Sequence, residues 1–583
     1  MREKKLVLFC VIAVFIAMFA FNFSLSAENS QYDAATVMGK LESEWWKTFS
    51  RFNYDNVCDR QHADGFFEES PSGGYELGFW PRTCGPLTKL WLNTGEAERA
   101  KRLLSLALAV TAAEGKGRVP HVISPAGTFV RPVEGTDIAV QTDMTTGLYL
   151  QREPYAGAQR FTAPDRPIIA VEAGLSGGTN GTITAVICQK PDGEPIASAT
   201  AERKSAAKEF MRFEFDKPIA LTAGGQYYLQ IKWEGGGDLI WHGKIDASHP
   251  LAGTMARDHG ITDTWEYNHK THVTAFAIDT GTLKHNNVTQ AAKASSMADQ
   301  IDGQAHVILG WALYVNKTGD TEFADRTYEQ VAALMDHSTQ PPYMTGEGEL
   351  GNLIYNSNLE HSRENYFLTT YDMLAQSFIA QSLREMIRVA ETRKDTAHVK
   401  AWSEKLAALE SAIADKMTWT LDGQKIYAEM YNKEMDGKIL DGLSWINLGI
   451  TASGWQGVDE TLYRATIKKY AEKATYIWKG NQVLGIQYTG GKETWRSSIG
   501  KGIGWEMLYY AQRGDWQRVG EILDYVYDAH EGNSRRMYGE AYHMQEEDSV
   551  IVHQDPGNGE QVTWFLACLS EVRKLLGLES IAR

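Results

Sequence analysis

The sequence has few cysteines for its length, which limits the disulfides that its fold can contain. Of 583 residues only five are cysteine: Cys10, Cys58, Cys84, Cys188 and Cys568. They form neither a Cys-x-x-Cys pair nor a Cys/His spacing typical of zinc, and so few thiols in a large chain do not make a disulfide scaffold. A single bridge between Cys58 and Cys84 stays open as an alternative.

The chain also lacks an excess of positive charge. It carries 58 Lys and Arg against 74 Asp and Glu, a formal net charge of −16. Proteins that bind nucleic acids use a basic surface to neutralise phosphates, so this balance argues against a nucleic-acid partner. The sequence also has no nucleotide-phosphate loop, no Gly-x-Ser-x-Gly elbow and no Cys/His protease pattern. We expect neither an organic cofactor nor a metal.

Only one apolar run is long enough to span a membrane, and it lies at the N-terminus. Arg2, Lys4 and Lys5 precede the apolar residues 6–23, and the small-residue stretch 24–27 follows. This pattern predicts a signal peptide cleaved after Ala27 and an exported, periplasmic or extracellular, protein without stable membrane contact. An uncleaved membrane anchor is the alternative. Residues 1–27 carry three positive charges and one negative charge, so cleavage changes the net charge from −16 to −18.

Amphipathic helices are predicted on both sides of a region whose apolar residues follow a different period. Apolar residues recur at i, i+3, i+4 and i+7, and turns such as Lys317-Thr318-Gly319-Asp320 separate the segments. The expected helices are residues 32–52, 82–92, 96–113, 302–316, 321–337, 365–392, 397–417, 442–451, 459–478, 500–513, 515–530 and 560–576. We interpret them as six antiparallel hairpins in a mainly α (α/α)6 toroid, whose loops form a funnel that carries the function.

The region between residues 119 and 279 alternates apolar and polar residues with a period of two. The clearest runs are 181–188, 210–215 and 226–233. Such runs predict short strands, and we interpret the region as an inserted, jelly-roll-like β-sandwich. The predicted domains are the signal peptide 1–27, the first part of the helical catalytic domain 28–118, the insert 119–279, and the rest of the helical domain 280–583.

Carboxylates, tryptophans and glycines concentrate in four segments that precede predicted helices. These segments contain the candidate site residues Trp80 and Arg82; Asp302 and Gln304; Glu360, Arg363 and Glu364; and Glu540, Asn558 and Gln561. Loops that a rigid scaffold holds in place commonly carry binding and catalytic residues. We therefore expect the functional site in these four segments.

The order of these motifs resembles that of a known group of enzymes. Trp80-Pro81-Arg82, Asp302-Gly303-Gln304, Leu359-Glu360, and Glu540 followed by Gly557-Asn558-Gly559-Glu560-Gln561 resemble the glucoamylase-type hydrolases of family 15 and, more widely, the six-hairpin glycoside hydrolases. The resemblance covers most of the helical part and none of the insert. It implies an (α/α)6 glycoside hydrolase that cleaves oligo- or polysaccharides with inversion, using two glutamates.

The resemblance also implies roles for individual residues. Glu360 matches the general acid and Glu540 the general base. Trp80 and Arg82 match a sugar-binding Trp-x-Arg-Asp element, and Asp302 matches a polar contact near the first sugar. The aspartate that follows the arginine in the family is Thr83 here, which argues against a terminal glucose as the substrate.

Glycoside cleavage explains why two carboxyl groups are needed. One protonates the leaving oxygen while the other activates a water on the opposite face, which requires a separation of about 6.5–9.5 Å. The acid must stay protonated, so it needs burial or a second carboxylate beside it. Glu347, Glu349 and Glu364 are near Glu360 in sequence. They either help to keep Glu360 protonated or replace Glu360 as the acid. Glu506 and Glu560 are the substitutes for Glu540 as the base.

Plainer interpretations of these residues stay open. Asp302 is also well placed to cap its helix, and Glu364 and Glu560 are favourable near a helix N-terminus for electrostatic reasons alone. Arg82, Arg363 and Arg496 are either ordinary ion-pairing residues or, if they converge, a site for an acidic sugar, since guanidinium pairs bidentately with carboxylate. The hypothesis of a uronic-acid substrate rests on Thr83 and these arginines.

Three alternatives compete with a glycosidase. A polysaccharide lyase or a sugar epimerase on the same toroid would use His or Tyr for proton transfer. A carbohydrate-binding protein without turnover would use the insert, with Trp233, Trp241 and Trp265 as platforms, although the insert equally suits a shield over the funnel.

The loop with His543, Glu546, Glu547, Asp548 and His553 has metal-ligand residue types, but most such clusters are solvated. The sequence leaves the oligomeric state undetermined.

Overall fold

The computed structural model describes most of the chain that follows residue 30. The described residues are 31–70, 78–114, 117–134, 138–141, 146–150, 156–203, 209–245, 248–257, 265–269, 272–296, 301–356, 370–432, 437–439, 444–473, 477–478, 481–482, 486–487, 496–531, 537–544, 551–553 and 556–582. The predicted signal peptide lies outside these residues. So do the candidate site residues Glu360, Arg363 and Glu364.

The helices fall into two groups, before and after a region of strands. The first group is α2 (Ala34–Leu41), α3 (Glu44–Asp59), the 3-10 helix η1 (Pro81–Thr83), α4 (Cys84–Thr94) and α5 (Ala97–Glu114). The second is α6 (Ile301–Thr318), α7 (Thr321–Ser338), α8 (Met373–Arg393), α9 (Thr396–Lys416), α10 (Ser444–Ser453), α11 (Glu460–Lys473), α12 (Gly500–Gln512), α13 (Trp516–His530) and α14 (Gly559–Leu575). Among the described residues, we find no helix with the length and apolar character that a membrane crossing requires.

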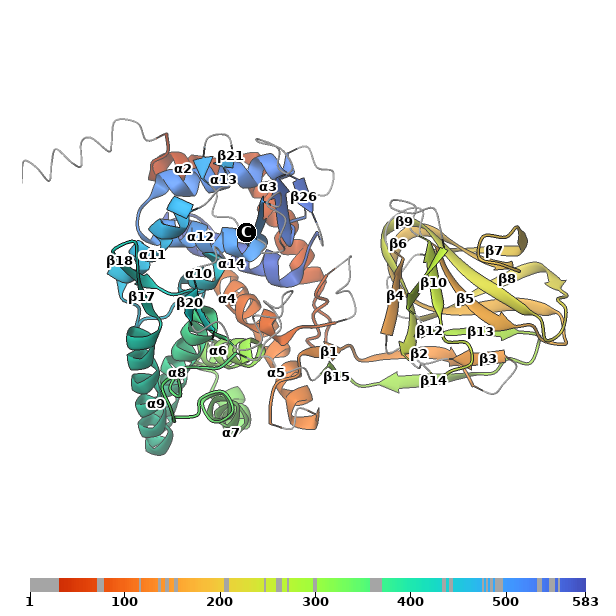
Figure 1. Ribbon diagram of the computed structural model, residues 1–583, viewed down its shortest axis with the longest axis horizontal. Helices are drawn as coiled ribbons and strands as arrows, with labels where there is room; N and C mark the ends of the chain where they lie inside the picture. Colours follow the sequence, from red (N-terminus) through yellow and green to blue (C-terminus); the bar gives the residue numbers. More distant parts are fainter. Residues whose placement is uncertain are drawn as a thin grey trace, which may run out of the picture.

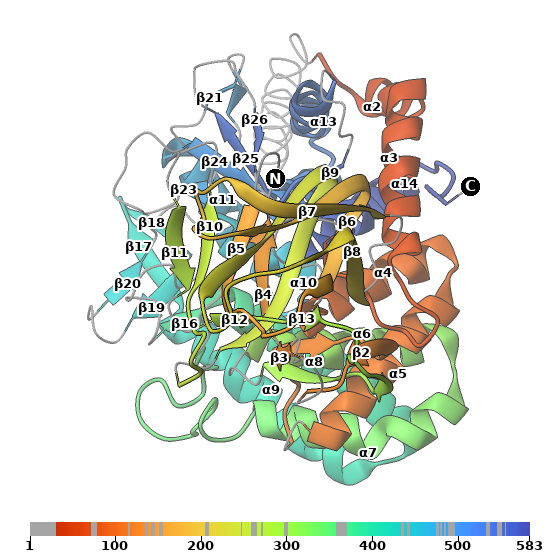
Figure 2. The same ribbon diagram turned by 90° about the vertical axis from the view of Figure 1, so that its right-hand side faces the viewer.

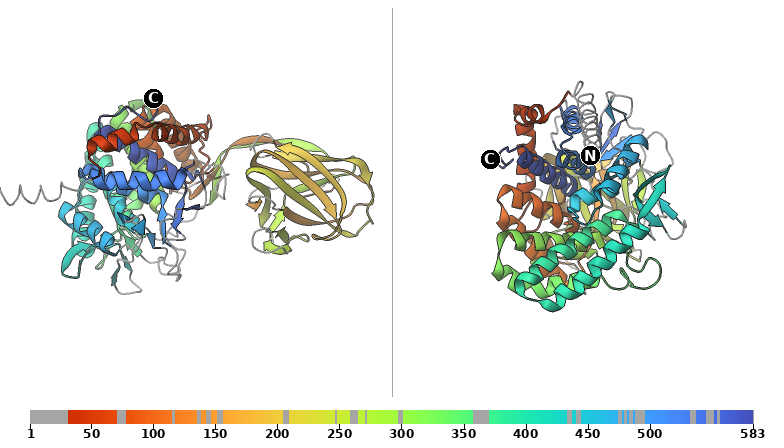
Figure 3. Two further views of the ribbon diagram at one scale, coloured as in Figure 1. Left: turned by 90° about the horizontal axis from the view of Figure 1, so that it is seen from above. Right: turned by 90° about the vertical axis from the view of Figure 1, so that its left-hand side faces the viewer.

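Alternate helices form a closed inner ring. In order around the ring, α4, α6, α8, α10, α12 and α14 each contact the next, and α14 contacts α4 again. The other long helices, α3, α5, α7, α9, α11 and α13, lie outside and pack against the inner ones, as Figures 1 and 3 show. This confirms the mainly α class and the (α/α)6 toroid. Since each outer helix is followed by an inner helix that runs back, all inner helices begin at the same end of the ring.

Several helix boundaries differ from the sequence-based expectation. The helix expected from residue 365 begins at Met373, and Thr370–Asp372 before it is a strand. Residues 32–52 form two helices, because Ser43 between α2 and α3 has an extended backbone (φ −64°, ψ 153°) and starts a new helix. Its carbonyl accepts the first hydrogen bond of that helix from the Lys47 amide at 3.0 Å. The helix expected at 459–478 ends at Lys473, and Ile477–Trp478 is a strand instead.

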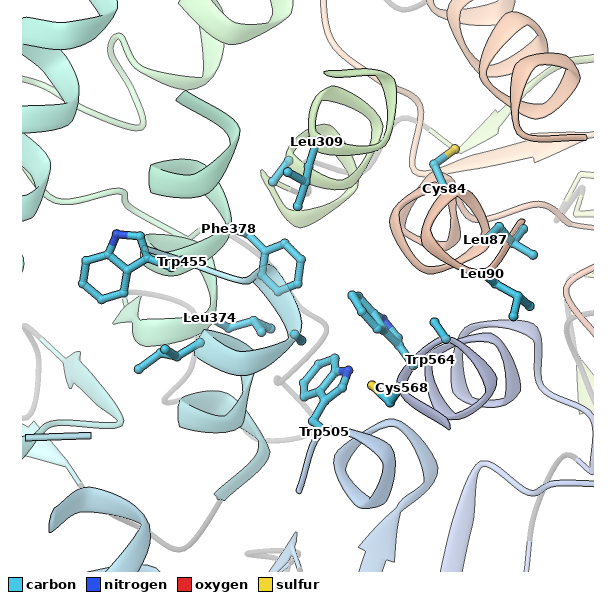
Figure 4. Packing of buried hydrophobic residues seen from close by; sticks show 14 of the residues in the cluster. Cys84, Leu87, Leu90, Leu309, Leu374, Phe378, Trp455, Trp505, Trp564 and Cys568 are labelled. Atoms are coloured by element: carbon cyan, nitrogen blue, oxygen red, sulfur yellow. The ribbon is translucent and has the colours of Figure 1, made fainter. Parts of the chain in front are cut away.

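Aromatic side chains fill the interior of the ring. Trp505 of α12 and Trp564 of α14 pack edge to face, with ring centroids 5.2 Å apart at 86°. Phe378 of α8 lies 6.0 Å from the ring of Trp564, and Figure 4 shows these rings together with Leu309 and Leu374. Edge-to-face contact places the positive edge of one ring on the negative face of the other. The ring is therefore a packed core, and its ends are the places for ligand binding.

The strands lie mostly between α5 and α6. They are β1 (Val122–Ser124), β2 (Gly127–Pro132), β3 (Ile138–Gln141), β4 (Thr146–Leu150), β5 (Ala156–Thr162), β6 (Ile168–Cys188), β7 (Pro195–Arg203), β8 (Glu209–Ile219), β9 (Gln226–Ile245), β10 (Thr254–Arg257), β11 (Trp265–His269), β12 (His272–Thr274), β13 (Phe276–Asp279), β14 (His285–Gln290) and β15 (Lys293–Ser296). Shorter strands lie in the connections of the ring: β16 (Thr370–Asp372), β17 (Thr418–Leu421), β18 (Gln424–Tyr427), β19 (Met430–Asn432), β20 (Gly437–Ile439), β21 (Ile477–Trp478), β22 (Asn481–Gln482), β23 (Ile486–Gln487), β24 (Arg496–Ile499), β25 (Ala541–Met544) and β26 (Ile551–His553).

Two long strands, β6 and β9, organise the inserted β domain. They pair antiparallel from Leu175 opposite Trp241 to Cys188 opposite Tyr228, with register shifts near Gly177 and Thr179. β9 also pairs with β4, β5 and β12, and β6 with β7, β8 and β13. Register shifts of this kind bend a strand, so one strand can contribute to both faces around a common core. Figure 2 shows this domain in front of the ring.

Trp233 and Trp241 belong to the core of the β domain. Their side chains are 1% and 0% exposed, and Trp241 Nε1 donates a hydrogen bond to the Ala275 carbonyl at 3.0 Å. A fully buried indole presents no face to a sugar. The interpretation of these two tryptophans as glycan platforms is therefore wrong, and the side chain of Trp265 lies outside the described residues.

Two short antiparallel ribbons connect the β domain to the ring. β1 pairs with β15 and β2 pairs with β14, so the strands continue past residue 279 to Ser296. Phe79, just before η1, forms a bridge with Ile123 of β1. Because the insert replaces the connection from the outer helix α5 to the inner helix α6, it leaves the ring at the end where the inner helices begin. Figure 1 shows the ribbons between the two bodies.

The four cysteines outside the predicted signal peptide are buried free thiols. Cys58 lies on α3 and Cys84 at the start of α4, and neither forms a disulfide. Burial raises the pKa of both thiols above the usual value. The structure therefore shows no bridge between Cys58 and Cys84.

The core role of Trp241 is testable. We expect Trp241→Ala to lower the free energy of unfolding of the β domain by about 3–5 kcal/mol, because it removes a buried ring and leaves a cavity. Calorimetry of the purified protein measures this change. The control is Ile196→Ala, since Ile196 of β7 is 45% exposed. Equal unfolding temperatures for the two variants would contradict the assignment.

Candidate functional site

The end of the ring where the inner helices begin brings the predicted site segments together. Arg82 lies in η1, Asp302 and Gln304 lie in the first turn of α6, and Glu560 and Gln561 lie in the first turn of α14. η1 contacts both α6 and α14. The first amides of a helix have no partner within the helix and give that end a partial positive charge. Carboxylates and sugar hydroxyls are well accommodated there.

A buried ion cluster joins η1, α12 and α14. Glu560 Oε1 lies 2.8 Å from Lys501 Nζ, and Glu560 Oε2 lies 3.2 Å from Arg82 Nε. The side chains of Glu560, Lys501 and Arg82 are 4%, 2% and 13% exposed. The Lys501 ammonium also lies over the Trp445 ring, 4.8 Å from its centroid. Burial of one carboxylate is costly, and the two cations offset that cost.

Asn558 and Gln561 hold the start of α14 in place. Asn558 Oδ1 accepts a hydrogen bond from the Gln561 amide at 3.2 Å, so Asn558 caps the helix. Gln561 Oε1 accepts from the Lys501 amide at 2.7 Å, and its Nε2 donates to Glu560 Oε2 at 3.4 Å. Their hydrogen bonds in this structure are made to the protein. The binding role expected for both residues stays a prediction.

Glu69, which the sequence analysis did not single out, lies beside the ion cluster. It is 1% exposed. Its Oε1 accepts hydrogen bonds from Thr83 Oγ1 at 2.7 Å and from the Glu560 amide at 2.8 Å. Burial raises the pKa of Glu69 to about 7, and the negative charge of Glu560 adds to this, whereas the hydrogen bond from Thr83 and the charge of Arg82 act against it. Glu69 therefore titrates near neutral pH.

Trp80 is half-buried beside this cluster. Its ring lies edge-on to His121, with centroids 6.4 Å apart. A Cβ at Gly78 would lie 2.3 Å from the Trp80 ring, so a glycine is needed for the ring to occupy this place. An indole has a flat apolar face on which a sugar ring can stack. The position of Trp80 is therefore compatible with the predicted sugar contact.

Asp302 and Gln304 are buried in the first turn of α6, at 5% and 1% exposure. Asp302 Oδ1 accepts a hydrogen bond from the amide of Gly303 at 2.8 Å. Gln304 Oε1 is buried and has no hydrogen-bond partner among the described residues. A buried amide oxygen without a partner costs free energy. A donor from a ligand or a water would remove that cost, which fits the predicted binding role.

Glu540 lies on the chain that precedes β25 and is half-buried. Its backbone carbonyl accepts a hydrogen bond from the Gly500 amide at 2.7 Å, at the start of α12. Tyr538 Oη donates to the Gly500 carbonyl at 2.8 Å. A Cβ at Gly500 would lie 2.5 Å from the Gly539 carbonyl oxygen, so only glycine allows this close approach. The backbone of the predicted base is thus fixed next to Lys501.

The carboxylates considered as substitutes lie in different places. Glu506 is 1% exposed and lies 3.5 Å from Arg518 of α13, so it faces the outer helix. Glu347 and Glu349 are exposed after α7, and Glu349 pairs with Lys416 at 3.2 Å. Of these substitutes, only Glu560 lies at the described site. The ion pairs with Lys501 and Arg82 give Glu560 a structural role there.

Several predicted residues lie outside the described part of the chain. Glu360, Arg363 and Glu364 fall in residues 357–369. The loop considered for a metal is described only in its backbone at His543 and His553. In the described parts of the chain we find no cluster of His, Cys, Asp and Glu that could hold a metal ion.

Sequence reasoning missed Glu69 and Lys501. Glu69 follows Glu68 in an acidic pair of the kind that usually lies on a surface, and Lys501 follows a glycine at the start of a helix. Neither pattern predicts burial. A usable signal was that Lys501 lies in the first turn of α12, a helix whose residues are mostly apolar and buried. A lysine that is buried with them needs an anion as a partner.

A model of the bacterial α-L-rhamnosidase six-hairpin glycosidase domain matches residues 241–441. The match begins in β9 and extends through α6, α7, α8 and α9. Together with the closed ring of hairpins, it supports the six-hairpin glycosidase superfamily for this chain. A particular closeness to the glucoamylase-type hydrolases is not shown. No curated protein matches the sequence significantly.

Solved structures of glycosidases resemble the chain at low identity. A wild-type glycosidase is 12% identical, with a TM-score of 0.43, over 93% of this chain and 98% of the other. A Klebsiella oxytoca rhamnosidase with bound rhamnose is 9% identical, with a TM-score of 0.35, over 79% and 98%. A metal-independent α-mannosidase of Streptococcus pneumoniae is 12% identical, with a TM-score of 0.36, over 49% and 71%. All three TM-scores lie below 0.5, so we transfer no residue roles from them.

The ion cluster is testable by its effect on stability. We expect Lys501→Met to lower the free energy of unfolding by about 3–5 kcal/mol, because it leaves the Glu560 carboxylate buried with one cation fewer. Urea denaturation measures the change. The double variant Lys501→Met with Glu560→Gln should lose less than the sum of the two single losses, because no unpaired anion remains. Strictly additive losses would show that the two side chains do not interact.

The titration of Glu69 predicts a pH dependence of stability. Its pKa is raised from the usual 4.5 to about 7 in the folded protein, so the folded state binds this proton more tightly than the unfolded chain. Its contribution to stability is therefore greatest below about pH 4.5 and falls as the pH rises to about 7, by at most about 1.4 kcal/mol per pH unit. Denaturation of wild type and Glu69→Gln across this range measures the difference. Parallel pH profiles for the two proteins would rule out this titration.

Proposed function

We propose that the protein is an exported glycoside hydrolase that cleaves oligo- or polysaccharides by inversion, with Glu360 as the general acid and Glu540 as the general base. The observation that carries the proposal is the buried cluster of Arg82, Lys501 and Glu560 at the end of the ring where the inner helices begin. Fixed charged groups beside a half-buried indole are the combination that a sugar, with its hydroxyls and apolar ring faces, requires.

Each step of the proposed reaction has its own group. The carboxylic acid of Glu360 protonates the glycosidic oxygen as the bond from that oxygen to the anomeric carbon breaks. The carboxylate of Glu540 takes a proton from a water whose oxygen attacks the opposite face of the anomeric carbon. The products are a sugar of inverted configuration and a free alcohol. No organic cofactor enters this scheme.

The surroundings of Glu540 suit a general base. Its backbone is tied to Gly500 at the start of α12, and β25 directly after it pairs with β24 over residues 541–544. A base must lie within hydrogen-bond reach of the water that it deprotonates, so a rigid backbone is an advantage. Trp80, Arg82, Asp302 and Gln304 would contact the sugar from η1 and α6.

The partners of Arg82 bear on the choice of sugar. Its guanidinium is already paired with Glu560, and the Thr83 hydroxyl is buried and bonded to Glu69. A substrate carboxylate would have to compete with Glu560 for Arg82, so we favour a neutral sugar over a uronic acid. The matching rhamnosidase model makes α-L-rhamnosides the first substrates to test.

Export is a separate part of the proposal. It is supported by the charged start, the apolar residues 6–23 and the small residues before Glu28. Mass spectrometry of the N-terminus of the protein isolated from its native cells tests it. A first residue of Glu28 is the expected result, and an intact Met1 in the membrane fraction would indicate an anchor.

The two-carboxylate mechanism predicts how two variants behave. We expect Glu360→Gln and Glu540→Gln each to lower kcat by about 10²–10⁴-fold, because each removes one proton-transfer group. Proton NMR of the anomeric signal during hydrolysis should show the inverted product first. The substrate panel contains α-L-rhamnosides, α-mannosides, α-glucosides and uronic-acid glycosides.

A matched control is Glu329→Gln, on the exposed face of α7, which should keep the wild-type rate. Retention of configuration would contradict the inverting mechanism. If no glycoside in the panel is cleaved, or if an unsaturated or epimerised sugar forms, a lyase, an epimerase or a binding protein replaces the hydrolase.

A further inference from the structure

The carboxylate of Glu69 occupies an unusual place between three parts of the chain. It lies after α3, in residues that lead from the outer helix towards η1, and is 1% exposed. Its side chain accepts hydrogen bonds from η1, through Thr83 Oγ1 at 2.7 Å, and from α14, through the Glu560 amide at 2.8 Å. The Trp80 amide lies 3.4 Å from its second oxygen. One carboxylate therefore contacts Trp80, Thr83 and the backbone of Glu560.

The backbone of Glu69 reinforces this arrangement. Its carbonyl accepts a hydrogen bond from the Gly559 amide at 2.5 Å and another from Arg60 Nη1 at 3.0 Å. A Cβ at Gly559 would lie 2.7 Å from the Glu69 carbonyl oxygen and 3.0 Å from Oε1. The start of α14 thus approaches Glu69 as closely as a glycine permits. Such contact transmits small displacements of Glu69 directly to Glu560.

The charges that face Glu69 are those of the candidate site. Arg82 from η1 and Arg60, which follows α3, attract it, and Glu560 from α14 repels it. The buried thiol of Cys84 on α4 also lies within its electrostatic influence. Lys501 of α12 acts on it through Glu560. Both residues of the Arg82–Glu560 ion pair are therefore coupled to Glu69, by charge and by hydrogen bonds through their neighbours.

We propose that Glu69 is a positioning residue of the sugar site, which through Thr83 and the Glu560 amide holds Arg82 and Glu560 in the geometry that binds the substrate. The proposal rests on the proposed function, since that function assigns Arg82 to substrate binding and Glu560 is the ion-pair partner of Arg82. Glu69 itself is buried and does not touch the sugar. Its loss therefore weakens binding of substrate more than it slows the chemical step.

The test compares variants that remove one side of this hydrogen-bond set at a time. Glu69→Met keeps a similar volume but removes both acceptor oxygens, and Thr83→Val removes only the hydroxyl donor. We expect each to raise KM about tenfold, the size of one lost charge-assisted hydrogen bond, with kcat changed less than twofold. Thr83→Ser, which restores the donor, should recover most of the affinity. The double variant should be no worse than the more affected single variant, because both break the same link.

The control is Glu68→Gln, because Glu68 is the neighbouring carboxylate, more exposed, and bonded to His62 at 2.8 Å. It should keep the wild-type KM. An unchanged KM in Glu69→Met with an active wild-type enzyme would overturn the positioning role and leave the hydrolase intact. Equal falls in kcat and in unfolding temperature for Thr83→Val and Thr83→Ser would also overturn it, since they would show a purely structural role.

A crystal structure of Glu69→Met separates this inference from the proposed function. We expect the distance from Arg82 Nε to Glu560 Oε2 to increase from 3.2 Å to beyond about 4 Å, the limit of an ion pair. This readout does not require a known substrate. An undisturbed Arg82–Glu560 pair would overturn the inference even in an active hydrolase, whereas a displaced pair in a protein that cleaves no glycoside would sustain the geometric link and reject the hydrolase.

Discussion

The carboxylate of Glu560, buried between Lys501 and Arg82, is the interaction on which the candidate site depends. It ties the starts of α12 and α14 to η1, and Glu69 adds the segment that follows α3 through the Glu560 amide. None of these charges is tolerable alone at this depth, because each would lose its hydration without a partner. The relative positions of the helix starts are therefore set by electrostatics, and not by apolar packing alone.

The ring beneath the cluster supplies the rigidity that such a site requires. Trp505, Trp564 and Phe378 pack against one another in the interior, and Lys501 rests on the Trp445 and Trp505 rings. Aromatic faces stabilise an ammonium group while excluding water. Trp505 thus both packs in the centre of the ring and supports the charged residues at its end. A preorganised polar site above an apolar core needs little rearrangement when a sugar binds.

The β domain lies at the end of the ring where the candidate site is found. It is inserted in a connection at the site end of the ring, and its ribbons β1–β15 and β2–β14 join it to the segment just before Trp80. Trp233 and Trp241 of this domain are buried in its own core. Trp233 and Trp241 are therefore not available as aromatic platforms for a glycan.

The sequence by itself determined the periodicities, and with them the mainly α ring, the β insert and the segments that contain Arg82, Asp302, Glu540 and Glu560, because helix and strand periods are local properties. The local pattern around Glu69 resembles an exposed acidic pair, and only the tertiary structure decided that this carboxylate is buried. Its partner at the Glu560 amide lies 491 residues away in the chain. Burial and pairing of charges depend on such distant contacts, which have no signature in local sequence. For the same reason the core positions of Trp233 and Trp241 could not be distinguished from surface platforms until the strands were placed in register.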